Sequence, residues 1–287
     1  MKNLFQKTQR GLRSTRQQGF TLVELAVVLA VIGLIIGAVA IGKDVQRNAE
    51  YTKIKNKFID QWEQAYNQYY QRNGVVLGDR QTAPQNMVNG DAFATAGAPG
   101  VAAVRSGRNM TGVTAPAAIC RAAAGRGMTR AFDPAADRDL RTLMTRAGIR
   151  MPPGRAEGLE DRYVYLDSNG NPQEIQVCFQ WNVPLSNTVG GADVGEGSGN
   201  VMVITGLTPD LARSLDQMID GKPDEREGRF RRQGVANTST GVPINAPGQE
   251  WNRTNRDSID AAHAVAGGRS FDEDQVAIVT AIYRMNQ

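Results

Sequence analysis

The chain has 287 residues, which is enough for one large domain or two small ones. Its 33 Lys and Arg outnumber its 29 Asp and Glu, yet residues 1–19 hold five basic residues and no acid, so the remainder carries a net charge of −1. Bulk charge therefore gives no argument for nucleic-acid binding. The chain has one histidine, His263, which argues against a multi-histidine metal site and against histidine-based catalysis.

Residues 20–42 form an apolar run in which Glu24 is the only charged residue. At about 1.5 Å per residue, this run makes a helix of roughly 34 Å, which can cross a bilayer core of about 30 Å. The basic residues that precede the run are expected to stay in the cytoplasm, so the chain after Lys43 is expected on the far side of the membrane.

Three interpretations of this run compete. It can be a plain membrane anchor, or it can be a secretory signal peptide, because Ala38-Val39-Ala40 fits a cleavage site. Against a signal peptide, the run is longer than the usual apolar core and Glu24 lies inside it. Because a carboxylate in an apolar helix is costly in lipid, the third interpretation makes Glu24 functional and requires a partner for its charge.

The residues around Glu24 carry a family resemblance. The run Gln18-Gly19-Phe20-Thr21-Leu22-Val23-Glu24, after a basic leader and before an apolar helix, resembles the class III signal of type IV pilins and type II secretion pseudopilins. The resemblance covers residues 1 to about 75, and the rest of the chain only in general architecture. It implies that a membrane-embedded prepilin peptidase cuts between Gly19 and Phe20 and methylates the new N-terminus at Phe20.

The same resemblance implies that Glu24 acts in assembly. In the family, the glutamate at the fifth mature position pairs with the N-terminal amine of an adjacent subunit, and Glu24 occupies that position. A charge pair is strong where the dielectric constant is low, and either charge alone is costly there. Gly33 and Gly37 have the G-x-x-x-G spacing that permits close helix packing, although such glycines are also tolerated in a helix that only faces lipid.

Residues 43–74 predict an amphipathic continuation of the helix. Apolar side chains recur there at steps of three and four residues without a proline, and they form one stripe: Tyr51, Ile54, Phe58, Trp62, Tyr66 and Tyr69. Gly74 is expected to end the helix after Asn73. The stripe is expected to be the face on which a sheet packs. The predicted domains are a cleaved cytoplasmic leader (1–19), a transmembrane half of the helix (20–42), an amphipathic half (43–74) and a globular head (75–287).

The head is predicted to be a small antiparallel sheet with two accessory helices. Residues 79–130 indicate an extended loop with at most a short helix near Cys120, and residues 222–268 indicate a polar, irregular segment. One helix is expected over 133–147, capped by Asp133, and another from Thr208 to Gly221 with Pro209 at its first position. Strands are expected over 162–166, 173–181, 201–205 and 275–283. The fold class is thus α+β, a pilin-like lollipop with a long N-terminal helix packed on a small sheet with long loops.

Two cysteines and two acidic patterns have alternative interpretations. Cys120 and Cys178 are expected to form a disulfide, because a head outside the cytoplasm lies in an oxidising compartment; two free buried thiols are the alternative. The run from Asp167 to Asn171 is similar to the start of a calcium loop, but Gly170 and Pro172 favour a hairpin turn. No metal is assigned there, or at Asp216, Asp220 and Asp224, which stand four residues apart.

An arginine-rich loop was weighed as a DNA contact, with a solvated mixed-charge loop as the preferred interpretation. It holds Arg226, Arg229, Arg231 and Arg232, mixed with Asp224, Glu225 and Glu227. Because both signs of charge alternate there, nucleic acid is not expected as a partner.

These observations predict a structural subunit of a type IV pilus-like filament that catalyses no reaction and needs no cofactor. Where many family members have a proline at the end of the anchor, this chain has Ile41-Gly42, which favours a minor pilin. The expected partners are other pilin or pseudopilin subunits, prepilin peptidase, an inner-membrane assembly platform and the lipid bilayer. The expected location is the bacterial inner membrane, with the head in the periplasm before assembly. A type II secretion pseudopilin and a membrane-anchored extracytoplasmic binding protein are the alternatives.

Overall fold

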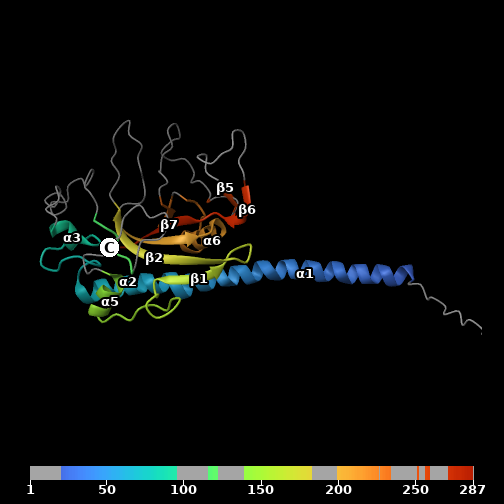
Figure 1. Ribbon diagram of the computed structural model, residues 1–287, viewed down its shortest axis with the longest axis horizontal. Coiled ribbons are helices and arrows are strands. Elements are labelled where there is room, and N and C mark those ends of the chain that lie inside the picture. Colours follow the sequence, from blue (N-terminus) through green and yellow to red (C-terminus); the bar gives the residue numbers. More distant parts are fainter. Residues whose placement is uncertain are drawn as a thin grey trace, which may run out of the picture. The chain divides into compact units, whose positions relative to one another are not determined.

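The structure is a computed structural model that describes residues 21–95, 116–121, 139–182, 199–225, 227–233, 251, 256–258 and 271–286. The chain divides into two compact units, Met1–Arg47 and Asn48–Gln287. Figure 1 shows the helices and strands, and each unit is described here by itself.

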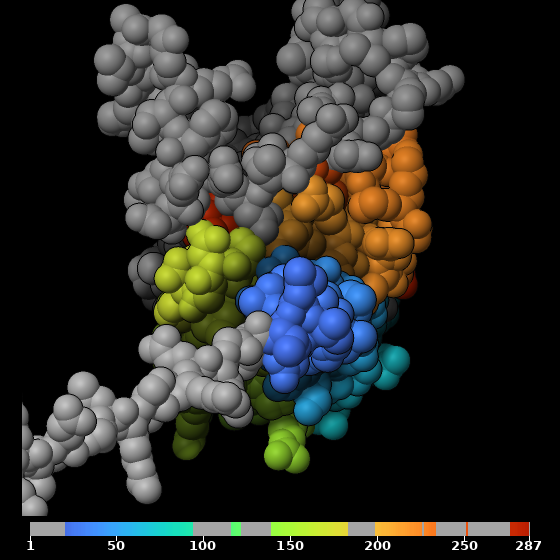
Figure 2. Space-filling view, turned by 90° about the vertical axis from the view of Figure 1, so that its right-hand side faces the viewer, coloured from blue at the N-terminus to red at the C-terminus, as the bar shows by residue number. Residues whose placement is uncertain are grey.

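Helix α1 (Leu22–Ile54) begins in the first unit and is apolar on all sides there. The large hydrophobic side chains from Leu22 to Val45 are between 46% and 86% exposed, and Figure 2, which looks onto the blue N-terminal end of α1, shows such side chains at the surface. The helix is long and apolar enough to cross a membrane. Its backbone stays α-helical through Ile41 and Gly42, where a proline would have kinked it.

In the second unit, the helix continues through a short π-helical segment, η1 (Lys55–Ile59), into helix α2 (Asp60–Asn73). All six residues of the predicted stripe, from Tyr51 to Tyr69, are buried, which confirms that prediction. The steps from Ile54 to Tyr66 are all four residues long and would drift off one face of a helix with 3.6 residues per turn. The wider π turn absorbs the surplus and keeps the stripe on one side.

Both ends of the π segment and the end of α2 have clear local causes. Lys55 and Asp60, five residues apart, form an ion pair at 2.9 Å, a spacing that fits the wider turn. Helix α2 ends at Gly74, which has the left-handed φ of +69° and donates its N–H to the Tyr70 carbonyl at 2.8 Å. The predicted stop at Gly74 is therefore confirmed.

The second unit contains a five-stranded antiparallel sheet in the order β1-β2-β3-β7-β4. Its strands are β1 (Arg162–Leu166), β2 (Pro172–Asn182), β3 (Gly199–Leu207), β7 (Val279–Arg284) and β4 (Phe230–Arg232). A separate pair consists of β5 (Arg256–Ser258) and β6 (Phe271–Val276). Strands β1 and β2 form the predicted hairpin, in which Tyr163 faces Ile175.

Helices α2 and α6 (Pro209–Asp220) share one hydrophobic core with a single face of the sheet. Trp62 and Tyr66 of α2 contact Phe179 of β2, with ring centroids 6.2 and 5.2 Å apart, and Leu215 of α6 belongs to the same cluster. The predicted α+β class, with the long N-terminal helix and a small antiparallel sheet, is confirmed. Helix α6 also begins after Thr208 with Pro209 at its start, as expected.

The opposite face of the sheet is buried as well. Cys178 of β2 and Val203 of β3 are fully buried, and so are the polar side chains of Gln176 and Gln180 to within 5%. The alternation of polar and apolar residues along β2 had predicted one polar face. Strand β2 is instead covered on both sides from Ile175 to Asn182.

Several predicted element boundaries were wrong. The helix expected over 133–147 starts only at Leu140, because Asp139 has an extended backbone and caps it (α5, Leu140–Arg146); Asp133 and Pro134 lie outside the described residues. The short helix of the 79–130 segment is α3 (Gly90–Thr95), whereas Ile119 beside Cys120 forms a β-bridge to Phe179. The strand expected over 275–283 is divided between β6 and β7.

The segment 222–268 was predicted to be irregular, yet it contains β4 and β5. Strand β4 has only three residues, too few for a periodic pattern, and its pairing partner is the last strand of the chain.

Candidate functional site

The beginning of α1 is a reciprocal cap made by Thr21 and Glu24. The Glu24 N–H donates to Thr21 Oγ1 at 3.3 Å, while the Thr21 N–H and hydroxyl donate to Glu24 Oε2 at 2.8 and 2.9 Å. The first helical bond runs from the Leu25 N–H to the Thr21 carbonyl at 3.2 Å. Thr21-x-x-Glu24 is therefore a capping box, which satisfies helix donors that would otherwise lack partners.

The cap gives Glu24 two donors from its own chain at the end of an apolar helix. Water cannot supply hydrogen bonds in the hydrocarbon region of a bilayer, so internal partners make the carboxylate less costly there. The sequence analysis identified Glu24 but missed the role of Thr21. The T-x-x-E spacing before an apolar run is the signal that could have revealed it.

The other residues of the predicted assembly site are placed only in part. Gly19 and Phe20, at the predicted cleavage and methylation site, lie outside the described residues. Gly33 and Gly37 lie on α1, and a Cβ added to either would meet no atom within 4 Å. Their proposed contact is between chains, so it stays a prediction.

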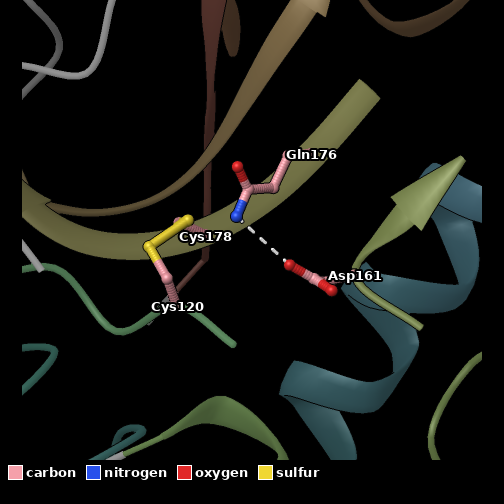
Figure 3. Close-up of a disulfide and its surroundings, with 4 residues drawn as sticks. All are labelled: Cys120, Asp161, Gln176 and Cys178. Atoms are coloured by element: carbon pink, nitrogen blue, oxygen red, sulfur yellow. Dashed lines mark hydrogen bonds between the residues drawn. A yellow bond between two sulfur atoms is a disulfide. The ribbon is translucent and has the colours of Figure 1, made fainter. Parts of the chain in front are cut away.

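Cys120 and Cys178 form the expected disulfide, with their Cα atoms 4.6 Å apart (Figure 3). It fastens the segment before α5 to β2, beside the paired backbones of Ile119 and Phe179, whose two hydrogen bonds measure 2.7 and 2.9 Å. Next to it on β2, Gln176 donates an amide N–H to Asp161 at 3.2 Å, as the dashed line in Figure 3 shows. Burial raises the pKa of Asp161, whose side chain has no exposed surface.

The segment from Asp167 to Asn171 is a hairpin turn in which the chain itself occupies the Asp167 carboxylate. Oδ1 accepts from the N–H groups of Asn169 and Asn171, both at 2.9 Å, and Oδ2 accepts from the Gln173 amide at 2.9 Å. Gly170 has the left-handed φ of +86° that the turn requires. The hairpin interpretation is confirmed.

Asp216 of α6 is fully buried and is the most perturbed acid among the described residues. Trp251 donates its Nε1–H to Asp216 Oδ2 at 2.7 Å. Burial raises the pKa of Asp216 to about 8, the charges of Asp220 and Asp224 add to the rise, and the Trp251 bond opposes it. Within the described part of the chain, no group of three or more His, Cys, Asp or Glu side chains could hold a metal ion.

The arginines weighed as a DNA contact are engaged within the head, apart from Arg226, which lies outside the described residues. Arg229 binds Glu63 of α2 at 3.1 Å and lies 4.9 Å above the ring of Tyr283, which also donates to Glu63 at 3.0 Å. The other two donate to Gly228 (Arg231, 2.7 Å) and to Glu225 (Arg232, 3.1 Å). These contacts tie the loop to α2 and β7.

A half-open groove of about 470 Å³ lies on the second unit, between α2 and residues 150–153. Three glutamine amides of α2 line one side, and Arg150 with two prolines lines the other: Gln61, Gln64, Gln68, Pro152 and Pro153. It has no charged group beyond Arg150, so it carries none of the paired acids and bases that catalysis requires.

Comparison with known proteins places the cap inside a family motif. Residues 14–40 match the model of the prokaryotic N-terminal methylation motif, which covers the leader end, Thr21, Glu24 and most of the apolar run. No curated protein and no solved structure matches the chain. The motif and the apolar helix together indicate a membrane-anchored substrate of prepilin peptidase. The chain thus carries the N-terminal signal of type IV pilins and pseudopilins.

Proposed function

We propose that the chain is a structural subunit, a minor pilin, of a type IV pilus-like filament. Prepilin peptidase cuts it after Gly19 and methylates Phe20, and the apolar helix then passes from the inner membrane into the filament. The chain is a substrate of the peptidase and catalyses no reaction itself. Its head lies in the periplasm before assembly, and the inner-membrane platform and other subunits are its partners.

The observation that carries this proposal is a carboxylate at the start of an otherwise apolar, exposed helix inside the methylation motif. After cleavage, the new amine at Phe20 is a positive charge of the kind that Glu24 lacks in the single chain. Pairing between neighbouring subunits satisfies both charges in a medium of low dielectric constant. The exposed apolar side chains of α1 lose their lipid contacts only where other helices cover them again.

The unbroken course of α1 through Ile41 and Gly42 supports the minor-subunit part of the proposal. A type II secretion pseudopilin shares the signal and the helix, and it is the second candidate. In either case the disulfide suits a head that folds outside the cytoplasm.

The test is the N-terminus and the oligomeric state of the protein purified from its native cells. Mass spectrometry should find a mature chain that begins with N-methyl-Phe20, and sheared cell-surface or periplasmic fractions should contain it in filaments. Glu24→Val should be inserted and cut normally but should assemble poorly. An intact leader on the membrane-bound protein would leave only a membrane-anchored binding protein.

A further inference from the structure

We propose that Thr21 is a positioning residue for assembly, which holds one oxygen of Glu24 so that the other faces the amine of a neighbouring subunit. This inference rests on the proposed function, in which that amine belongs to the mature N-terminus. It adds a residue and an orientation to a charge pair that would otherwise depend on a freely rotating side chain.

The geometry of the cap is asymmetric. Both donors of Thr21, its backbone N–H and its hydroxyl, reach Glu24 Oε2, at 2.8 and 2.9 Å. Glu24 Oε1 accepts no hydrogen bond from the residues that the structure describes. A carboxylate oxygen has lone pairs for more than one donor, so Oε1 is a complete acceptor for an ammonium group. Charge-assisted hydrogen bonds of that kind are the strong ones.

The two bonds to Oε2 also fix the direction of the side chain. A free glutamate loses rotamer entropy when it enters a single geometry, and this loss opposes the charge pair. In α1 the capping box imposes that restriction before any neighbour arrives. The Thr21 hydroxyl links the two halves of the device, because it donates to Oε2 and accepts from the Glu24 N–H.

The position of the cap also fits a water-free setting. The Thr21 and Glu24 N–H groups belong to the first turn, where no helical acceptor is available. In lipid, a side-chain acceptor must replace water, and each of the two residues supplies it for the other. Removing the hydroxyl therefore leaves the Glu24 N–H without its acceptor and the carboxylate with one donor fewer.

Four variants of the full chain, produced in the native cells, test the inference. Thr21→Val removes the hydroxyl and keeps the branched shape, whereas Thr21→Ser keeps the hydroxyl. Glu24→Gln keeps a capping-box acceptor but removes the charge. Thr52→Val is the matched control, because Thr52 also uses its hydroxyl on α1, donating to the Asn48 carbonyl at 2.9 Å.

The readouts are N-terminal mass spectrometry for cleavage and methylation, and the yield of sheared filaments for assembly. A non-reducing gel that shows the Cys120–Cys178 bond verifies that each head has folded. We expect Thr21→Val to be processed normally and to give about five-fold fewer filaments, the effect of losing a typical helix cap. Thr21→Ser and Thr52→Val should match the natural protein, and Glu24→Gln should give almost none.

The outcomes separate this inference from the proposed function. If Thr21→Val assembles normally and Glu24→Gln does not, the charge pair stands and the role of Thr21 is overturned. If both assemble normally, the proposed function itself fails. Equal defects in Thr21→Ser and Thr21→Val would show that the hydroxyl is not the cause, and a cleavage defect in Thr21→Val would place its effect before assembly; each overturns the inference.

Discussion

Loss of the Cys120–Cys178 bond should lower the stability of the head by several kcal/mol. The bond closes a loop between residues 58 positions apart, and for a loop of this length the chain-entropy model gives about 4 kcal/mol. In the folded head, the backbone pair of Ile119 and Phe179 keeps the same segment on β2. The double variant Cys120→Ala/Cys178→Ala should therefore fold, and its loss should come mainly from a less restricted unfolded chain.

Urea unfolding of the full chain in mild detergent measures this loss. All three tryptophans are buried in the second unit, Trp62, Trp181 and Trp251, so their fluorescence reports on the head. With a denaturant slope of about 2 kcal/mol per molar urea, the midpoint should fall by about 2 M.

The natural protein in the presence of a reductant is the control, because it loses the bond and keeps both sulfur atoms. Similar falls in both samples would assign the effect to the cross-link. A change below about 0.5 M in both would refute the reasoning. A fall in the alanine variant alone would assign it to the small cavities that alanine leaves.

Two further predictions concern the head. Because the folded state raises the pKa of Asp216 to about 8, it binds a proton that the unfolded chain releases near pH 4. Stability should therefore fall as pH rises from about 4 to 8, by up to about 1.4 kcal/mol per unit; Asp216→Asn, which keeps an acceptor for Trp251, should flatten the melting temperature between pH 5 and 8, and an unchanged slope would contradict this. Gly206→Ala should cost about 3 kcal/mol or more in thermal unfolding, since φ is +81° and the new Cβ would collide with the Glu174 carbonyl. Its control, Gly170→Ala, has φ +86° and open space, so it should cost only about 1 kcal/mol, and equal losses would argue against the collision.

Sequence reasoning worked best where one local signal decides the structure. The aromatic stripe from Tyr51 to Tyr69, the stop at Gly74 and the start of α6 at Pro209 each depend on residues within a few positions. The hairpin of β1 and β2 was equally readable, because two apolar strands flank a turn-rich run. Glu24 was identified because one charge in an apolar run is unusual.

The rest depends on contacts between distant segments. Strand β4 exists because Phe230 faces Tyr283 across the sheet, and three residues alone carry no periodic signal. Asp216 is perturbed because Trp251, 35 residues later in the chain, covers it. Strand β2 is buried on both faces, which no single strand can indicate when its sequence alternates.

The π turn at Lys55–Ile59 has a consequence for how this stem can vary in length. A regular α-helix advances about 100° per residue, so deletion of one residue there would restore ordinary winding but rotate everything that follows by that angle. Tyr51 and Ile54 could then stay in the core only if Trp62 and Tyr66 turned away from Phe179, or the reverse. Relatives that lack the extra residue would need a differently spaced stripe, whereas loss or gain of a residue upstream of Tyr51 would leave the head undisturbed.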